Sequence, residues 1–281
     1  MILLKGTLSR PRKVVIYGPE GSGKTTLSSN TPIPVIIDLE DGTSQMDVKR
    51  ILMSKDWQEL IAVVREIANT PGTCKTLVID TADMAERLCI KYVCEKHGVT
   101  CIEDLPFGRG YTYLAEEFSL LIQALNEVLA AGINVVVTAH SRLRKIEQPD
   151  QAGAYDRWEM KLTKQAAPGL KEWCDLLLFL NYKTYVVKSN STNKAQGGKR
   201  VMYANHHPCW DAKNRFGLPD EMDLDYEKIA HLFENGEVQS PLAKLRSLMA
   251  DASVSDEDLQ KVVTARGKQP EGTPIDSYPS E

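Results

Sequence analysis

The chain has 281 residues, of which 42% are hydrophobic and 26% are charged, with a net charge of −4. This length suits one sizeable domain with an appendage. No apolar run reaches the ~18 residues of a membrane helix, and the short apolar start lacks the cleavage site of a secretory signal. We therefore expect a cytoplasmic protein without a membrane segment, whose six cysteines are free thiols.

Four potential zinc ligands lie close together in the sequence: Cys89, Cys94, His97 and Cys101. Zinc sites commonly pair ligands two residues apart, and these residues do not have that spacing. Cys89 also falls on the apolar side of an expected helix. The pattern therefore favours cysteines that serve packing over a zinc site.

Strands and helices are expected to alternate along the first two thirds of the chain. Near-continuous apolar strands between amphipathic helices predict an α/β fold with a mostly parallel central sheet and helices on both faces. The expected strands cover residues 14–17, 34–40, 76–80, 133–139, 174–180, 185–188 and 200–204, the last two joined by a polar turn at 189–198. The expected helices are one of about seven residues after a glycine-rich loop, then 57–68, 82–97 and 114–131.

The character of the sequence changes near residue 240. We expect a core domain over residues 1–239 and a small helical segment over 240–267. That segment contains two short helices, at 241–250 and at 256–265, the second capped by Ser255. Residues 268–281 are rich in proline and polar residues, a composition typical of a disordered tail.

The strongest signal is the stretch from Gly18 to Thr25, which matches the pattern GxxxxGK[ST] between a strand and a helix. Glycines let successive backbone N–H groups point into one concavity, and the following helix directs its free N–H groups to the same place. Lys24 is expected to reach the β- and γ-phosphates of ATP, and the Thr25 hydroxyl to bind Mg²⁺. The residues expected to bind nucleotide are Gly18, Gly21, Ser22, Gly23, Lys24, Thr25 and Thr26.

Polar residues end three further strands. Asp80 follows an apolar run and suits the aspartate that holds Mg²⁺ through water. Glu40 is expected to act on the water that attacks the γ-phosphate, provided that its strand neighbours the strand before the glycine loop; Asp38 is its rival. His140 ends the fourth core strand and is expected to sense the γ-phosphate and report its presence to the following segment.

This set of strand ends resembles the RecA-like ATPase core, in which the last position is usually Gln where this chain has His140. More narrowly, the sequence resembles the Sak-four class of phage-type single-strand annealing and recombination ATPases over residues 10–220. The stretches that carry this resemblance are IYGPEGSGKTTL, VIIDLEDG, LVIDT, DLPFGRGY, VVVTAHSR and HHPCWDAKNRFGLP. The resemblance implies annealing or strand exchange in homologous recombination and a homo-oligomeric ring or filament in the cytoplasm, of the host if the protein is phage-encoded.

The same resemblance implies two loops that contact single-stranded DNA, here residues 98–113 and 141–168. Residues 141–200 carry twelve Lys and Arg against six Asp and Glu, and both segments contain aromatic residues. Basic groups neutralise phosphates, and aromatic rings stack on unpaired bases. The candidates for DNA binding are Arg109, Arg142, Arg144, Lys145, Lys161 and Lys164.

RecA-like proteins also receive a basic residue from a neighbouring subunit, and Lys213 and Arg215 are the candidates here. Two other functions stay open at this point. One is a regulatory ATPase that acts on a protein partner, and the other is a small-molecule kinase with a mobile lid. A GTPase is disfavoured because the sequence has no NKxD motif. The C-terminal segment is a candidate for recruiting a partner such as a single-strand-binding protein.

Overall fold

The computed structural model describes residues 10–70, 72–147, 153–189, 192–234, 249 and 254–266. Contacts divide the chain into two units, Met1–Gly236 and Glu237–Glu281. The second unit contains helix α8 (Asp256–Ala265), which Ser255 caps as expected. The predicted helix at 241–250 lies outside the described residues except for Met249, and the predicted tail at 268–281 lies wholly outside them. The domain boundaries at residues 239 and 267 therefore stay predictions.

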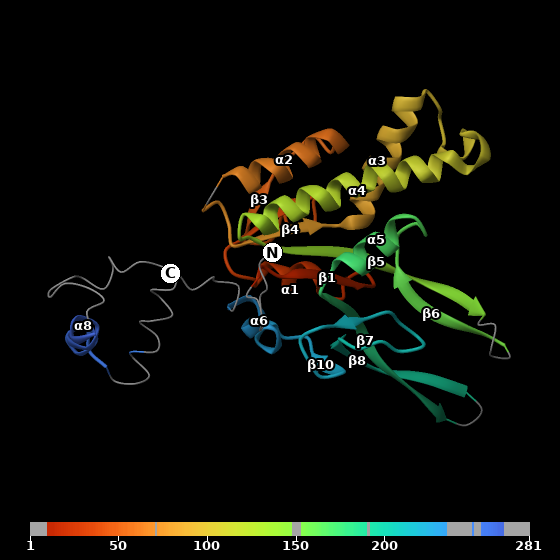
Figure 1. The fold of residues 1–281 in the computed structure, drawn as a ribbon. Coiled ribbons are helices and arrows are strands. Elements are labelled where there is room, and N and C mark those ends of the chain that lie inside the picture. Colours follow the sequence, from red (N-terminus) through yellow and green to blue (C-terminus); the bar gives the residue numbers. More distant parts are fainter. Residues whose placement is uncertain are drawn as a thin grey trace. The chain divides into compact units, whose positions relative to one another are not determined.

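The first unit is an alternation of strands and helices, as predicted (Figure 1). Its strands are β1 (Lys13–Gly18), β2 (Pro34–Asp38), β3 (Lys49–Ile51), β4 (Thr76–Asp80), β5 (Asn134–Glu147), β6 (Ala154–Met160), β7 (Leu176–Ser189), β8 (Thr192–Tyr203), β9 (Lys213–Asn214) and β10 (Glu221–Asp223). Its helices are α1 (Lys24–Ser29), α2 (Trp57–Asn69), α3 (Ala82–His97), α4 (Arg109–Ala130), α5 (Ala166–Trp173) and α6 (Ala230–Glu234), with short 3-10 turns η1 (Ile102–Asp104), η2 (Pro106–Gly108) and η3 (Tyr226–Lys228).

The strands form one sheet in the order β10–β8–β7–β1–β5–β4–β2–β3, with β6 paired to β5 and β9 paired to β7. The six strands from β7 to β3 along this path pair in parallel, and β8 and β10 extend the sheet with antiparallel pairs. The carboxyl ends of the parallel strands therefore meet at one edge. The predicted mostly parallel α/β fold is confirmed.

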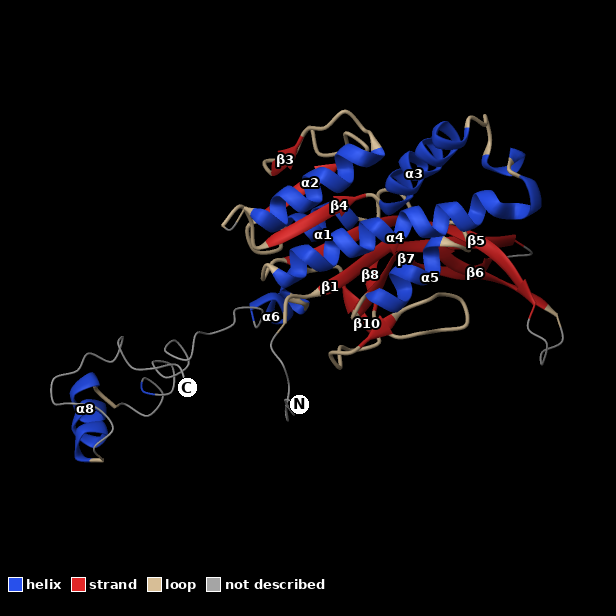
Figure 2. Cartoon of the chain, turned by 45° about the horizontal axis from the view of Figure 1, so that its top comes forward, coloured by secondary structure: helices blue, strands red, loops and turns tan. Residues whose placement is uncertain are grey.

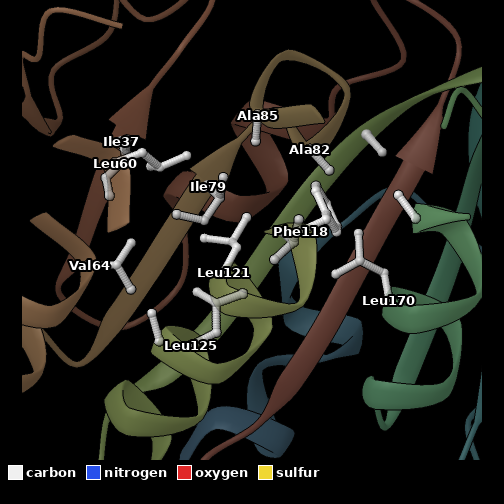
Figure 3. Packing of buried hydrophobic residues seen from close by; sticks show 14 of the residues in the cluster. Ile37, Leu60, Val64, Ile79, Ala82, Ala85, Phe118, Leu121, Leu125 and Leu170 are labelled. Carbon is white, nitrogen blue, oxygen red and sulfur yellow. The ribbon is translucent and has the colours of Figure 1, made fainter. Parts of the chain in front are cut away.

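Two buried clusters hold the layers together. On one face α2, α3, α4 and α5 pack on the sheet, and on the other face α1 and α6 do so (Figure 1). Figure 3 shows Phe118, Leu121 and Leu125 of α4 among the side chains packed on the first face, with Ile79 of β4 nearby. Each such fully buried apolar side chain contributes about 1.5–3 kcal/mol, so these clusters fix the sheet edge that carries the polar strand ends.

Helix α4 begins at Arg109, five residues before the predicted start at residue 114. The prediction placed Gly110 in a loop because glycine disfavours helix interiors. A Cβ at Gly110 would lie 2.2 Å from the carbonyl oxygen of Ile102. Glycine is therefore required here by close packing against the preceding turn, and the helix tolerates it.

Two polar stretches take part in β-hairpins that are longer than the sequence predicted. Strand β5 continues past His140 to Glu147 and pairs antiparallel with β6, so residues 141–160, predicted as a loop, are largely a hairpin. Strands β7 and β8 pair from Phe179 and Tyr203 out to Ser189 and Thr192, which takes in most of the predicted turn at 189–198. Figure 1 shows that both hairpins extend from the sheet toward the same side of the molecule, and Figure 2 gives a second view of them.

Candidate functional site

The loop after β1 has a conformation that requires glycine at two points. A Cβ at Gly18 would lie 2.3 Å from the backbone oxygen of Leu180, and one at Gly23 would lie 2.7 Å from a Leu224 methyl carbon. Gly23 also has a φ of 98°, which side chains rarely adopt. The glycine pattern in the sequence thus reflects both backbone geometry and the close approach of neighbouring segments.

Lys24 lies at the start of α1 and points back over the loop. Its ammonium donates to the backbone oxygens of Gly18, at 3.1 Å, and Pro19, at 3.0 Å. Burial lowers the pKa of Lys24, and the nearby carboxylates of Asp80 and Asp83 oppose that shift. The positive charge of Lys24 therefore lies inside the loop in which the motif predicts that phosphates bind.

Thr25 and Asp80 come together from α1 and β4. The Thr25 hydroxyl donates to Oδ2 of Asp80 at 2.9 Å, and Thr138 of β5 donates to the other carboxylate oxygen. Burial raises the pKa of Asp80, and these two hydrogen bonds oppose the rise. Hydroxyl and carboxylate oxygens are the ligands that Mg²⁺ prefers, so this pair fits the ion that the motif predicts.

The two carboxylates at the end of β2 have different surroundings. Asp38 accepts hydrogen bonds from the backbone N–H groups of Glu40, Gly42 and Thr43 and from the Thr43 hydroxyl. Burial alone would raise the pKa of Asp38, but these bonds lower it overall. Asp38 therefore organises the turn that follows the strand, and Glu40 is the carboxylate that lines the loop.

Strand β2 is not the neighbour of β1, because β5 and β4 lie between them. The condition that we attached to the role of Glu40, that its strand neighbours β1, is therefore not met. Glu40 nevertheless reaches the site: it accepts a hydrogen bond from Thr81 at 2.8 Å and lies 3.5 Å from Nδ1 of His140. The turn held by Asp38 carries it there.

His140 is held by Asp83, a residue that no sequence motif indicated. One carboxylate oxygen of Asp83 accepts the backbone N–H of His140 at 2.9 Å, and the other lies 3.0 Å from Nδ1. The hydrogen bond with Asp83 raises the pKa of His140. Asp83 lies three residues after Asp80, in the first turn of α3. This position beside the predicted Mg²⁺ aspartate is the one feature of the sequence that could have pointed to Asp83.

Glu40, Asp83 and His140 offer ligand atoms that lie within 4.8 Å of one another, close enough for a cation. The hydrogen bonds between Asp83 and His140 already use two of these atoms. The arrangement therefore holds His140 by hydrogen bonds to Asp83, with Glu40 at 3.5 Å from the same ring nitrogen.

These groups surround a pocket of about 300 Å³, which we call the loop pocket. It also contains Arg200 of β8. The sequence placed Arg200 in an expected strand and gave no sign that it would reach this pocket. Ser22 lies in the loop with its hydroxyl buried and without a hydrogen-bond partner among the described residues. The residues lining the pocket are Glu20, Gly21, Gly23, Lys24, Thr25, Thr26, Glu40, Gly42, Met46, Asp80, Thr81, His140 and Arg200.

A second cavity, of about 530 Å³, shares Gly23, Thr26 and Arg200 with the loop pocket. It continues along α1 past Leu27 and reaches Tyr226. Its walls combine the apolar side chains of Leu27 and Leu224 and the ring of Tyr226 with polar and charged groups, a mixture that suits the base and ribose of a nucleotide.

A third cavity, of about 570 Å³, lies at the base of the β5–β6 hairpin. It brings together both segments predicted to contact DNA, because Tyr111 comes from the first and Arg142 and Arg144 from the second. We call it the cationic pocket; it is lined by Tyr111, Arg142, Leu143, Arg144, Thr163, Lys164 and Gln165.

The remaining predicted DNA contacts, Arg109, Lys145 and Lys161, are exposed residues outside this lining. Arg142 keeps its buried Nε without a hydrogen-bond partner in the described part of the chain, whereas Arg144 lies 3.5 Å from Glu159. Phe107 stands out nearby in sequence, because its side chain is 96% exposed. Phe107 is thus the most exposed large apolar side chain that the structure describes in these segments.

Helix α3 connects the loop pocket to the cationic pocket. Asp83 in its first turn holds His140 in β5, and Glu86 in its next turn accepts the backbone N–H of Thr163, at 3.0 Å, and its hydroxyl, at 2.6 Å. Strand β5 and the segment that follows β6 are therefore both hydrogen-bonded to the helix that follows Asp80.

Lys213 and Arg215 do not reach the loop pocket of their own chain. Lys213 pairs in β9 with Leu177 near the amino end of β7, and its ammonium donates to the backbone oxygens of Lys171 and Glu172. Arg215 forms an ion pair with Asp175 at 2.7 Å. Both lie toward the sheet edge opposite the loop, so any role in hydrolysis would have to act on another subunit.

The six cysteines are free, and Cys89 is buried on the core side of α3 as its position predicts. None of them belongs to a cluster of potential metal ligands among the described residues. No helix in the described ranges is long and apolar enough to cross a membrane.

A family model described as an AAA domain matches residues 10–216. The chain belongs to this AAA domain family. With the glycine loop after β1 and the mostly parallel sheet described above, it has the fold of a P-loop NTPase.

No curated protein matches the chain. Solved structures with a similar fold include the RadB recombinase, at 16% identity and a TM-score of 0.42, covering 79% of this chain and 91% of that chain. A KaiC-like protein from Pyrococcus horikoshii OT3 is 13% identical with a TM-score of 0.38, covering 69% and 79% of the two chains. The flagellar accessory protein FlaH from Methanocaldococcus jannaschii is 9% identical with a TM-score of 0.36, covering 70% and 79%.

Proposed function

We propose that this ATPase binds single-stranded DNA and promotes annealing or strand exchange in phage-type homologous recombination, with hydrolysis that depends on Mg²⁺ and is stimulated by DNA. The observation that carries the nucleic-acid part is the cationic pocket, in which Tyr111, Arg142 and Lys164 from both predicted segments surround one cavity. Cations there would neutralise phosphates, and the exposed ring of Phe107 would stack on a base.

In the loop pocket, the backbone from Gly18 to Gly23 and the ammonium of Lys24 would hold the β- and γ-phosphates of ATP, with Ser22 and Thr26 beside them. Thr25 and Asp80 would hold Mg²⁺, which supplies positive charge to the phosphate oxygens when bound. Glu40 would accept a proton from the attacking water. His140, held by Asp83, would contact the γ-phosphate.

Binding of a nucleotide in the loop pocket would change the DNA site through α3. A shift of His140 toward a phosphate would move the base of β5, because Asp83 holds both the backbone and the ring of that residue. Glu86 would transmit the same movement to the segment after β6 through its hydrogen bond with Thr163.

We further propose a homo-oligomer, ring or filament, in which Lys213 or Arg215 approaches the ATP of the next subunit. Their place toward the sheet edge opposite the loop is compatible with a role in trans. The second unit of the chain would recruit a partner such as a single-strand-binding protein.

The test is the affinity for fluorescent oligo-dT at several salt concentrations. We expect salt-sensitive binding by the wild-type protein. Arg142→Ala and Lys164→Ala should each weaken it about 5- to 10-fold and reduce the salt slope by about 0.7 for each phosphate that is no longer neutralised. Lys49→Ala, at an exposed cation of the distant strand β3, is the matched control. Equal affinity of all variants, or no binding by the wild type, would contradict the proposal.

A further inference from the structure

A fourth cavity, of about 620 Å³, lies between the two hairpins. Trp158 of β6 forms one wall, and residues 181–185 of β7 with Tyr203 of β8 form the other. The cavity begins at Pro19, whose carbonyl oxygen accepts a hydrogen bond from the ammonium of Lys24. We call it the aromatic groove; it is lined by Pro19, Trp158, Asn181, Tyr182, Lys183, Thr184, Tyr185 and Tyr203.

Two of its aromatic rings are fixed by packing from behind. The ring of Trp158 lies 6.1 Å from that of Phe179, which is fully buried. The ring of Tyr203 lies 6.0 Å from Phe179 and 4.3 Å from Trp210. These rings form a preformed surface that loses little side-chain entropy when a flat ligand stacks on them.

Tyr185 differs from these two rings, because it projects from the hairpin into solvent. Its side chain is 56% exposed, which is unusual for a large aromatic residue at the mouth of a groove. A solvent-exposed aromatic ring that faces a groove with two fixed rings is the arrangement by which single-strand-binding surfaces hold unpaired bases.

The charge of the β7–β8 hairpin fits a polyanion. From Leu176 to Trp210 the chain has five Lys and Arg and no Asp or Glu. Lys183 pairs with Glu221 and Lys199 pairs with Asp223, so the neighbouring strand β10 offsets part of this charge. Lys183 is the cation that lines the aromatic groove.

We propose that the aromatic groove binds unpaired bases of a single nucleic-acid strand, by stacking on Tyr185, Trp158 and Tyr203, with Lys183 near its phosphates. This proposal rests on the proposed function and extends the DNA surface beyond the two segments predicted from the sequence, to the β7–β8 hairpin that neither of them includes.

A strand held in the aromatic groove would lie directly beside the phosphate loop. Pro19 of that loop lines the groove. The hydroxyl of Tyr182, which also lines it, lies 3.2 Å from where a Cβ would stand at Gly21. Bases stacked in the groove would therefore be close to the residues that the motif assigns to ATP.

The groove has no built specificity for one base. Stacking uses the face that every base offers, and four of the eight lining residues are the aromatic residues Trp158, Tyr182, Tyr185 and Tyr203. The site therefore suits a protein that acts on strands of any sequence.

The test compares Tyr185→Ala with Tyr185→Phe in the full-length protein, with Leu52→Ala, at an exposed apolar side chain just after β3, as control. We expect Tyr185→Ala to weaken oligo-dT binding by about 5- to 100-fold, the effect of one base that no longer stacks, without changing the salt slope. Tyr185→Phe should retain binding because it keeps the ring. Photo-crosslinking of an oligonucleotide containing iododeoxyuridine should map to residues 182–185.

The outcomes separate this inference from the proposed function. If wild-type protein does not bind oligo-dT, both fail. If wild-type binds and Arg142→Ala weakens binding while Tyr185→Ala does not, the proposed function stands and the aromatic groove is not a DNA site. A Tyr185→Phe variant as weak as Tyr185→Ala would also overturn stacking, since it would point to the hydroxyl.

Discussion

The loop pocket and the cationic pocket satisfy their polar groups in different ways. In the loop pocket Lys24, Thr25, Asp80 and His140 all have hydrogen-bond partners within the chain. At the cationic pocket Arg142 keeps a buried Nε without a partner among the described residues, and Phe107 of the neighbouring segment is almost fully exposed.

This difference shows which site the fold prepares by itself. The side chains of the loop pocket are held by strands of the core, so they keep one geometry. When a ligand binds, they need only replace their hydrogen bonds within the chain by hydrogen bonds to the ligand. Each site also keeps one buried polar atom without a partner among the described residues, Oγ of Ser22 in the loop and Nε of Arg142 at the cationic pocket. The difference therefore lies in the charged groups of the loop pocket, which the fold itself holds in place.

The largest effect is expected at Lys24. Lys24→Ala removes the cation that the loop holds and should reduce ATP hydrolysis by about 10³-fold or more, since such clamps stabilise the charge of phosphoryl transfer. Steady-state ATPase assays measure it, with Lys49→Ala as control. An unchanged circular dichroism spectrum would show that the fold is retained, and near-normal turnover would contradict the assignment.

The next effect separates the two carboxylates after β2. Glu40→Gln should leave ATP binding intact and slow hydrolysis about 10²-fold, because it removes the proposed base. Asp38→Asn should instead lower the free energy of unfolding by about 1–3 kcal/mol, because Asp38 accepts four hydrogen bonds in the turn. ATPase assays and urea unfolding distinguish them. Slow hydrolysis by a stably folded Asp38→Asn variant, with normal Glu40→Gln, would reverse the roles.

A smaller effect is expected where the two pockets are joined. Thr163→Val removes the hydroxyl that donates to Glu86 and keeps the shape of the side chain. Hydrolysis without DNA should stay within about two-fold of wild type, while DNA stimulation should fall several-fold, because the segment after β6 loses one hydrogen bond to α3. Rates measured with and without oligo-dT decide this, and an equal decrease in both would indicate general damage.

The smallest effect concerns pH. The hydrogen bond with Asp83 raises the pKa of His140, so its contribution to stability is fully present below the unfolded value of about 6.5 and is lost as pH rises through the folded value. The melting temperature of wild type relative to His140→Gln should therefore fall as pH rises above about 6.5. A difference that does not change with pH would show that the ring does not titrate beside Asp83.

The core could be predicted well from the sequence because its signals are local. Apolar runs and the glycine pattern at Gly18 and Gly23 placed the strands and the loop, and strand ends marked Glu40, Asp80 and His140. The pairing of Asp83 with His140 was missed because the two residues are distant in sequence and only the sheet brings them together. The β5–β6 hairpin and the full length of the β7–β8 hairpin were missed because their outer strands mix polar and apolar residues without a long apolar run, and such stretches resemble loops in composition.

The central proposal is that the cationic pocket and the loop pocket act together. The most direct measurement is the ATPase rate of the wild-type protein with and without single-stranded DNA at low and high salt. We predict a faster rate with DNA and a stimulation that declines as salt screens the phosphate contacts. Rates that are equal with and without DNA at both salt concentrations would contradict this coupling.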